Sequence, residues 1–509
     1  MKLFSFKGGV KPDPNKSLST VLPIAQAPLV NRYIVPLHQS VGGTPRPIVK
    51  QGDYVLKGQR IGEADGWVSA AVHAPTSGTV VEIGPHIVPH PSGLPTDCVV
   101  IEADGRDTWI ERKAFDIDNA SAEAVREYLR DMGIVGMGGA VFPSHVKLSV
   151  PRGKQVEELI INGAECEPFI TCDDRLMREQ AAEVVQGSAL FGKLIGAQRV
   201  LIGVEDNKPE AIAALQAATA ELGSTVEVIT VPTIYPTGGA KELIRVLTGK
   251  EVPASKRSTD FSVQVFNVAT VQSAWRAIQY GEPLISRIVT ISGAVGESRN
   301  WSVPIGMTIT DLIALAQPKP ETDGVIMGGP MMGFRVSTNA APVIKATNSL
   351  IVNAPGLFPK KPQELPCIRC GSCATACPQE LQPFELYWWS RASKFEQLEK
   401  YKLFDCIECG CCDYVCPSHI PLVNYFRFSK SEIQAEQREK QMADAARERF
   451  EFREARAERE KREKAERLAK ANAARKAAEA TVAKPETESG TIFLLFGGPE
   501  RSTHPTQAS

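Results

Sequence analysis

The sequence predicts a multidomain α/β protein. The chain has 509 residues, which is enough for about three or four domains. Between residues 119 and 286, apolar runs alternate with helix-forming segments, a pattern typical of a largely parallel sheet. Short strands precede this region, and two cysteine-rich blocks follow it. The net charge of −1 gives no indication of nucleic acid as a partner.

Residues 1–118 are predicted to form one domain. It begins with an extended lead-in over residues 1–35, and short strands joined by turns follow. The units at 48–62 and 72–83 resemble the biotinyl/lipoyl-type barrel-sandwich hybrid. Carrier domains of that fold present a lysine at a hairpin tip, and the matching segment 65–71 has none. We therefore expect a docking or scaffold domain.

Residues 119–286 are predicted to form an α/β domain. Its first helix begins after Ser121, a suitable N-cap, and ends near Met132. Strands are expected at 158–162, 199–205 and 226–231, with helices ending near Gly192 and covering 208–222. In such a sheet the ligand crevice lies at the carboxyl ends of the strands.

The pattern changes after residue 286. Residues 287–345 resemble a small β-grasp module, with strands at 288–295 and 301–309 and a helix at 310–316. A proline-rich linker covers residues 355–366.

The last two predicted parts are helical. Residues 355–430 contain the cysteine blocks, with a helix expected over 384–401 between them. Residues 431–509 are predicted to be a charged, Ala-rich helical extension, to about 483, and a disordered tail from Pro485. An exposed arm is favoured over a partner-binding arm.

Nine of the twelve cysteines lie in two blocks with the pattern C-x2-C-x2-C-x3-C-P. This is the bacterial iron–sulfur run, in which the fourth cysteine ligates the other cluster of a pair. It predicts two [4Fe–4S] clusters in an α-helical, ferredoxin-type domain. One would be held by Cys367, Cys370, Cys373 and Cys416, and the other by Cys406, Cys409, Cys412 and Cys377.

Two other uses of these cysteines are disfavoured. Structural zinc takes four ligands as two C-x2-C pairs, whereas each block holds a complete four-cysteine run. Disulfides need an oxidising compartment, but no apolar core follows the charged start of the chain and no run approaches the roughly 18 apolar residues of a membrane span. We therefore expect a cytoplasmic location or one on the cytoplasmic face of a membrane.

A glycine cluster and an acidic motif predict a nucleotide site. Gly136, Gly138 and Gly139 do not form G-x-G-x-x-G, but they let a phosphate or a flat ring approach the backbone. Lys147 can supply positive charge. Glu165 and Glu167 follow a predicted strand. A tight turn with a solvated charge pair explains these residues equally well.

The glycine run and the segment Ile-Ile-Asn-Gly-Ala-Glu-Cys-Glu-Pro resemble the flavin- and NADH-binding subunit of respiratory complex I. This resemblance implies FMN bound by Gly136, Gly138, Gly139, Lys147, Asn162 and Glu165, and NADH contacted by Phe142 and Glu167. The chain departs from that family at Ala164, where the family has an aspartate, and at Gly239 and Ala240, where it has two glutamates.

The order of modules over about residues 1–430 is similar to that of the C subunits of the Rnf (Rsx) electron-transport complexes. This resemblance implies an NADH dehydrogenase-type oxidoreductase subunit that exchanges electrons between NAD(H), FMN and two clusters, with ferredoxin or flavodoxin as an indirect partner. It implies a peripheral location on the cytoplasmic side of a bacterial inner membrane, beside integral subunits and a cluster-bearing B subunit. No side-chain acid, base or nucleophile is required.

Two alternatives remain open from the sequence. One is a soluble diaphorase-type subunit of an NAD-linked hydrogenase or formate dehydrogenase, which would not need residues 1–118. The other is a non-enzymatic iron–sulfur relay whose nucleotide pocket has degenerated, as the three departures suggest.

Overall fold

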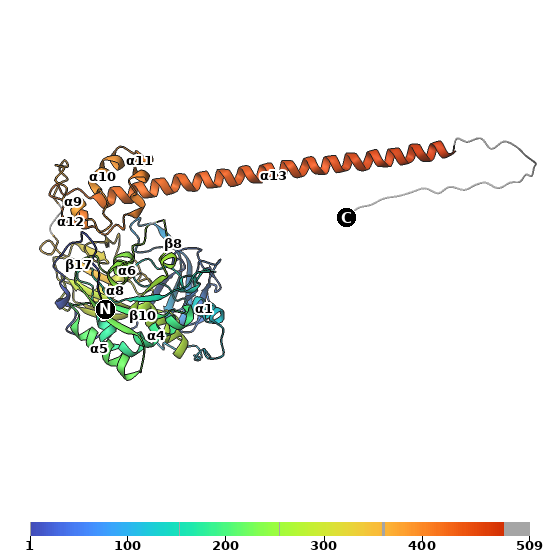
Figure 1. Ribbon diagram of the computed structural model, residues 1–509. Coiled ribbons are helices and arrows are strands. Elements are labelled where there is room, and N and C mark those ends of the chain that lie inside the picture. The colour runs from blue at the N-terminus through green and yellow to red at the C-terminus, as the bar shows by residue number, and fades with distance from the viewer. Residues whose placement is uncertain (1, 152, 254, 359–361, 483–509) are drawn as a thin grey trace, which may run out of the picture. The chain divides into compact units, whose positions relative to one another are not determined.

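The computed structural model describes residues 2–151, 153–253, 255–358 and 362–482. The chain divides into two compact units, Met1–Ser431 and Glu432–Ser509. The first unit contains all of the sheets named below (Figure 1). The predicted disordered tail from Pro485 and part of the predicted linker, residues 359–361, lie outside the described residues.

A four-stranded parallel sheet forms the centre of the predicted α/β domain. Its order is β11-β10-β9-β12, and the register places Asn162 beside Asn267 at the carboxyl ends of two strands. The predicted parallel sheet is confirmed, although the fourth strand was not predicted. The strands are β9 (Glu158–Asn162), β10 (Arg199–Glu205), β11 (Glu227–Val231) and β12 (Val263–Asn267).

Helices accompany this sheet. The predicted N-cap is confirmed, because the Ser121 side chain accepts a hydrogen bond from Ala124 N. The helix expected to end near Gly192 is two helices, since Gln180 leaves the helical conformation between them. The helices are α1 (Ala122–Asp131), α2 (Ser144–Leu148), α3 (Cys172–Glu179), α4 (Ala181–Ile195), α5 (Pro209–Glu221), α6 (Ala240–Thr248) and α7 (Val268–Tyr280).

The N-terminal strands form two small antiparallel sheets around a buried core that includes Tyr33, Ile61 and Val99. This is the predicted barrel-sandwich arrangement. One sheet has the order β2 (Arg32–Pro36), β8 (Pro95–Ala103), β7 (Gly78–Ile87), β4 (Tyr54–Val55), and the other β3 (Arg46–Pro47), β5 (Arg60–Glu63), β6 (Val72–His73).

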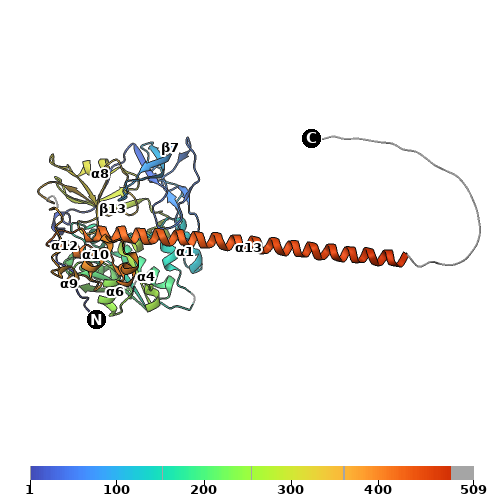
Figure 2. The same cartoon turned by 90° about the horizontal axis from the view of Figure 1, so that it is seen from above.

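A six-stranded mixed sheet follows the α/β domain and differs from the expected bounds. It continues past residue 345, and it takes in β1 from the lead-in as a parallel neighbour of β14. It lies beside the N-terminal strands (Figure 2), where Ile34 N donates to Gly306 O. Its strands are β1 (Ala25–Gln26), β14 (Arg299–Pro304), β13 (Ser286–Gly293), β17 (Ser349–Asn353), β15 (Gly324–Met327) and β16 (Phe334–Arg335), with α8 (Ile309–Leu315).

The cysteine region is helical, as predicted. The helix expected over 384–401 is interrupted, because Ser393 has a left-handed backbone with φ of 50°. The final helix begins earlier than the predicted start at residue 431, and its side chains from 436 to 480 are exposed. The helices are α9 (Ser372–Thr375), α10 (Pro383–Arg391), α11 (Phe395–Lys400), α12 (Cys411–Tyr414) and α13 (Leu422–Val482). Among the described residues, no helix combines the length and the apolar character needed to cross a bilayer.

Candidate functional site

The eight cysteines predicted as iron ligands surround two separate cavities. Cys416 of the second block lines the cavity of the first, and Cys377 of the first block lines the cavity of the second. The structure therefore brings the thiols together in the crossed groups that the spacing predicts. The first group is Cys367, Cys370, Cys373 and Cys416, and the second is Cys377, Cys406, Cys409 and Cys412; Cys411, outside the predicted set, also lines the second cavity.

The two blocks repeat one backbone conformation. Gly371 and Gly410 precede the short helices α9 and α12, and both have φ of 79°. Arg369 and Glu408, at equivalent positions of the two blocks, are also left-handed. A left-handed residue ahead of a short helix turns the chain sharply, so each block wraps its first three thiols around one cavity.

The two thiol groups differ in exposure. Cys370 is exposed and Ile368 beside it is 68% exposed, whereas Cys409 and Cys412 are buried. Lys430 donates to the Cys406 carbonyl at 2.6 Å. The first group thus reaches the surface of the protein, while the second faces its interior.

A cavity of about 550 Å³ lies at the carboxyl ends of β9 and β12. It extends from the glycine loop to Ile407 and Cys409 of the second cysteine group. A single hollow therefore joins the predicted nucleotide site to one predicted cluster site. Five of the predicted residues line it: Gly138, Gly139, Asn162, Glu165 and Glu167.

Three predicted residues, Gly136, Phe142 and Lys147, do not line this cavity. Gly136 N donates to Phe142 O at 2.8 Å and closes the base of the glycine loop. Phe142 is half-buried. The Lys147 ammonium donates to Val265 O and lies 4.5 Å from the Phe266 ring centre. Burial lowers the pKa of Lys147 to about 8.

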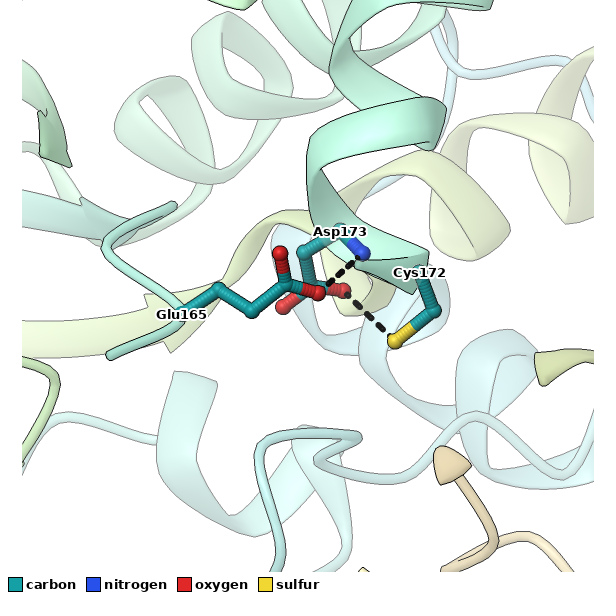
Figure 3. A group of neighbouring side chains, drawn as sticks. All are labelled: Glu165, Cys172 and Asp173. Atoms are coloured by element: carbon teal, nitrogen blue, oxygen red, sulfur yellow. Dashed lines mark hydrogen bonds between the residues drawn. The ribbon is translucent and has the colours of Figure 1, made fainter. Parts of the chain in front are cut away.

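The carboxylate of Glu165 caps the start of α3 (Figure 3). It accepts hydrogen bonds from Asp173 N at 2.7 Å and Asp174 N at 3.2 Å. The Cys172 thiol donates to Asp173. Asn267 donates to the other oxygen of Asp173. Burial is the largest influence on Glu165 and raises its pKa to about 8. The neighbouring Lys16 ammonium opposes this shift in the pKa.

The ligand atoms of Glu165, Cys172 and Asp173 lie within 4.8 Å of one another. Oxygen and sulfur atoms so placed could hold a cation, but each side chain already has a hydrogen-bond partner within the protein. We interpret the group as part of the cavity wall.

The loop after β9 contains Glu165 and Glu167 and is called the acidic loop below. Glu167 connects this loop to the six-stranded sheet. Its carboxylate accepts hydrogen bonds from Met331 N at 2.7 Å and Met332 N at 2.9 Å. Gly329 makes this approach possible, because a Cβ there would lie 2.0 Å from the Glu167 side chain. The domain of the six-stranded sheet thereby contributes one wall of the cavity.

Several further residues of the cavity lie outside the predicted set. Asn162 donates to Gly238 O at 2.8 Å, and Tyr235 donates to Cys409 O at 2.7 Å. The available signal for this segment was its comparison with the complex I family, which drew attention to Gly239 and Ala240. No sequence signal pointed to Glu242. Its carboxylate fills the space beside Gly239, where a Cβ added to the glycine would lie 2.2 Å from a Glu242 oxygen.

The residues present fit both kinds of cofactor. Four thiols around one cavity are the donor set of a [4Fe–4S] cluster. The large cavity is within the 300–1,000 Å³ typical of small-molecule sites. A Cβ at Gly139 would meet nothing within 4 Å, which leaves the backbone of the loop open to a flat ligand. The start of α7, capped by Asn267, offers positive potential for a phosphate. The Lys241 ammonium also borders the cavity, although it pairs with Asp405 at 3.8 Å.

Three family descriptions match separate parts of the chain. "RnfC Barrel sandwich hybrid domain" matches residues 4–106, "Nuo51 FMN-binding domain" matches residues 129–276, and "4Fe-4S dicluster domain" matches residues 366–420.

Two curated relatives are similar over most of this chain. The C subunit of the ion-translocating oxidoreductase complex of Pseudomonas aeruginosa is 47% identical over 89% of this chain and 59% of its own length. The corresponding C subunit from Pasteurella multocida is 46% identical over 88% of this chain and 54% of its own length. The chain thus spans a little over half the length of these relatives. A solved NAD⁺-reducing [NiFe]-hydrogenase superposes with a TM-score of 0.42 and 20% identity, over 56% of this chain and 57% of that chain.

Proposed function

Since the chain belongs to the family of C subunits of the ion-translocating oxidoreductase complexes, we propose that it exchanges electrons between NAD(H) and two [4Fe–4S] clusters through a bound FMN. The observation that carries this proposal is the single cavity that extends from Gly138 and Gly139 to Cys409. A flavin in this cavity would lie beside the second cysteine group.

The chemistry divides between cofactors and protein. FMN, when bound, accepts two electrons from a nicotinamide and releases them singly, which suits one-electron iron–sulfur carriers. The protein binds and orients the flavin and the nicotinamide nucleotide. We propose that Gly138, Gly139, Asn162 and Glu165 contact the flavin and that Glu167 contacts the nicotinamide nucleotide.

The three predicted residues that do not line the cavity have a supporting role in this proposal. Gly136 and Phe142 close the glycine loop through their mutual hydrogen bond. Lys147 fixes the carboxyl end of β12 through Val265, two residues before the cavity residue Asn267. Their contribution is the shape of the loop.

We propose crossed ligation for the clusters, with Cys416 completing the first group and Cys377 the second. The positions of these cysteines around the two cavities support it. The second group, beside the large cavity, would exchange electrons with the flavin. The first group, which reaches the surface, would exchange them with a partner.

The setting of the protein is part of the proposal. The names of the relatives indicate one component of an ion-translocating complex. We propose a peripheral subunit on the cytoplasmic side of a bacterial inner membrane. Its partners would be integral subunits and a cluster-bearing B subunit, with ferredoxin or flavodoxin reached indirectly.

The test is anaerobic purification followed by cofactor analysis and an assay. We expect one FMN and about eight iron atoms per chain, and reduction of ferricyanide by NADH. A chain that holds both clusters but neither binds FMN nor oxidises NADH would be a relay, and the proposal would be wrong. If the protein stays soluble when its neighbouring subunits are co-expressed, the diaphorase alternative is favoured.

A further inference from the structure

The N-terminal lead-in contacts the back of the acidic loop through Lys16. Its ammonium donates to three backbone carbonyls, those of Glu165 (2.6 Å), Glu167 (2.9 Å) and Ile170 (2.6 Å). It also lies 4.0 Å from the Glu165 carboxylate, and its side chain is only 12% exposed. A lysine far away in sequence therefore fixes the course of this loop.

A second buried lysine acts on the preceding peptide. Lys208 donates to Ala164 O at 2.6 Å and pairs with Glu205 at 3.2 Å. Its side chain is 1% exposed. Lys16 and Lys208 thus hold the carbonyls of two successive peptides, Ala164–Glu165 and Glu165–Cys166.

These lysines determine where the N–H groups of the same peptides point. In a trans peptide the C=O and N–H bonds point in opposite directions. The N–H groups of Glu165 and Cys166 therefore point away from Lys208 and Lys16. Both residues line the large cavity, and among the described residues neither N–H group has a hydrogen-bond partner.

Two backbone features keep this pair of donors accessible. Glu165 has a left-handed backbone, with φ of 48°, and successive N–H groups at such a residue form a concave nest for an electron-rich atom. Gly238 faces the nest, where a Cβ would lie 3.4 Å from Cys166 N and 2.8 Å from Cys166 Sγ. Glycine at this position leaves the approach open.

We propose that Lys16 and Lys208 are positioning residues that aim the N–H groups of Glu165 and Cys166 at an electron-rich oxygen or nitrogen of the flavin ring. This inference rests on the proposed function. The donors favour the reduced ring, which carries more electron density at those atoms, so they raise the reduction potential of the bound flavin.

The test compares single variants of the full-length chain carrying its clusters. Lys16→Met removes the ammonium and keeps most of the side-chain volume. Lys11→Met is the matched control, because Lys11 is exposed on the same lead-in segment. Lys16→Arg keeps the charge and the capacity to donate. The measurements are flavin content and the midpoint potential of the bound flavin by spectroelectrochemistry.

We expect Lys16→Met to reduce the preference for reduced over oxidised flavin about tenfold, which is about 30 mV for a two-electron couple. Lys16→Arg should recover part of this loss, and Lys11→Met should match the wild type. An unchanged potential in a Lys16→Met protein with normal iron and flavin content would overturn the inference. Wild-type protein that binds no FMN would overturn the proposed function instead.

If Lys16→Met does not yield folded protein, the midpoint potential of the flavin in Gly238→Ala tests the inference instead. It leaves both lysines in place and puts a methyl group against the nest. A lowered potential supports the inference, and a wild-type potential with full flavin content rejects it.

Discussion

The phenol of Tyr235 donates a hydrogen bond of 2.7 Å to the backbone carbonyl of Cys409. Tyr235 lines the large cavity, and Cys409 belongs to both that cavity and the second thiol group. The two residues are 174 positions apart in sequence. This bond therefore links the wall of the proposed flavin site directly to a proposed cluster ligand.

We expect Tyr235→Phe to slow electron exchange between the flavin and the second cluster several-fold. The ring still belongs to a buried cluster with Val10 and Ala376, so the free energy of unfolding should change by only about 1 kcal/mol, the usual contribution of one hydrogen bond. Stopped-flow absorption after mixing with NADH measures cluster reduction. Wild-type kinetics in a variant with full cofactor content would show that the bond is only structural.

Cys416→Ala should remove the cluster of the first block. Cys416 lines the cavity of Cys367, Cys370 and Cys373, so its loss leaves three thiols there and four in the other group. We expect about half of the iron and one remaining EPR signal. The control is Cys98→Ala, a buried cysteine of the N-terminal sheet. Selective loss of the other cluster would contradict crossed ligation.

Features formed by residues close together in sequence could be predicted, whereas a feature formed by residues far apart in sequence could not. The spacing predicts the crossed groups in which the thiols surround the two cavities, because each block supplies three neighbouring thiols and a fourth at a fixed step. Ligation of iron by these thiols stays a prediction. Three strands of the parallel sheet were predictable because each contains an apolar run, whereas β12, which includes Gln264, was missed. The nest was not, because it depends on Lys16 and Glu165, which are 149 positions apart.

The glycine loop was harder to interpret for a different reason. Residue types suggested that Lys147 faces a phosphate, but the direction of its side chain depends on the carbonyl of Val265 in an adjacent strand. Likewise Gly239 seemed to mark a lost carboxylate. In the folded protein Glu242, from the first turn of α6, occupies that space.

His73 should make the stability of the protein depend on pH below neutrality. It is buried, its Nδ1 has no partner among the described residues, and burial followed by the charge of Lys345 lowers its pKa to about 3. Between pH 6.5 and 3 the unfolded chain binds the proton and the folded chain does not. Stability is therefore lost as the pH falls, by about 2 kcal/mol at pH 5 from this group alone.

His73→Leu should remove that part of the pH dependence. The measurement is the free energy of unfolding in urea at pH 7 and pH 5, followed by tryptophan fluorescence. His90→Leu serves as the control, because His90 is an exposed residue. If His73→Leu loses as much stability on acidification as the wild type does, the buried neutral state of His73 is wrong.

Glu165→Gln should make flavin binding independent of pH between 7 and 9. In the wild type, burial raises the pKa of the Glu165 carboxyl to about 8, so the ionised fraction grows as the pH rises from 7 to 9. The resulting negative charge lies in the wall of a cavity proposed to hold an anionic nucleotide, so the dissociation constant of FMN should rise about tenfold by pH 9. Glutamine stays neutral, and its oxygen can still accept the hydrogen bond from Asp173 N.

Flavin fluorescence titrations at the two pH values measure the effect, with the exposed Glu102→Gln as the control. An equal rise in Glu165→Gln would assign the pH dependence to another group, and no rise in the wild type would mean that the carboxyl does not ionise in this range.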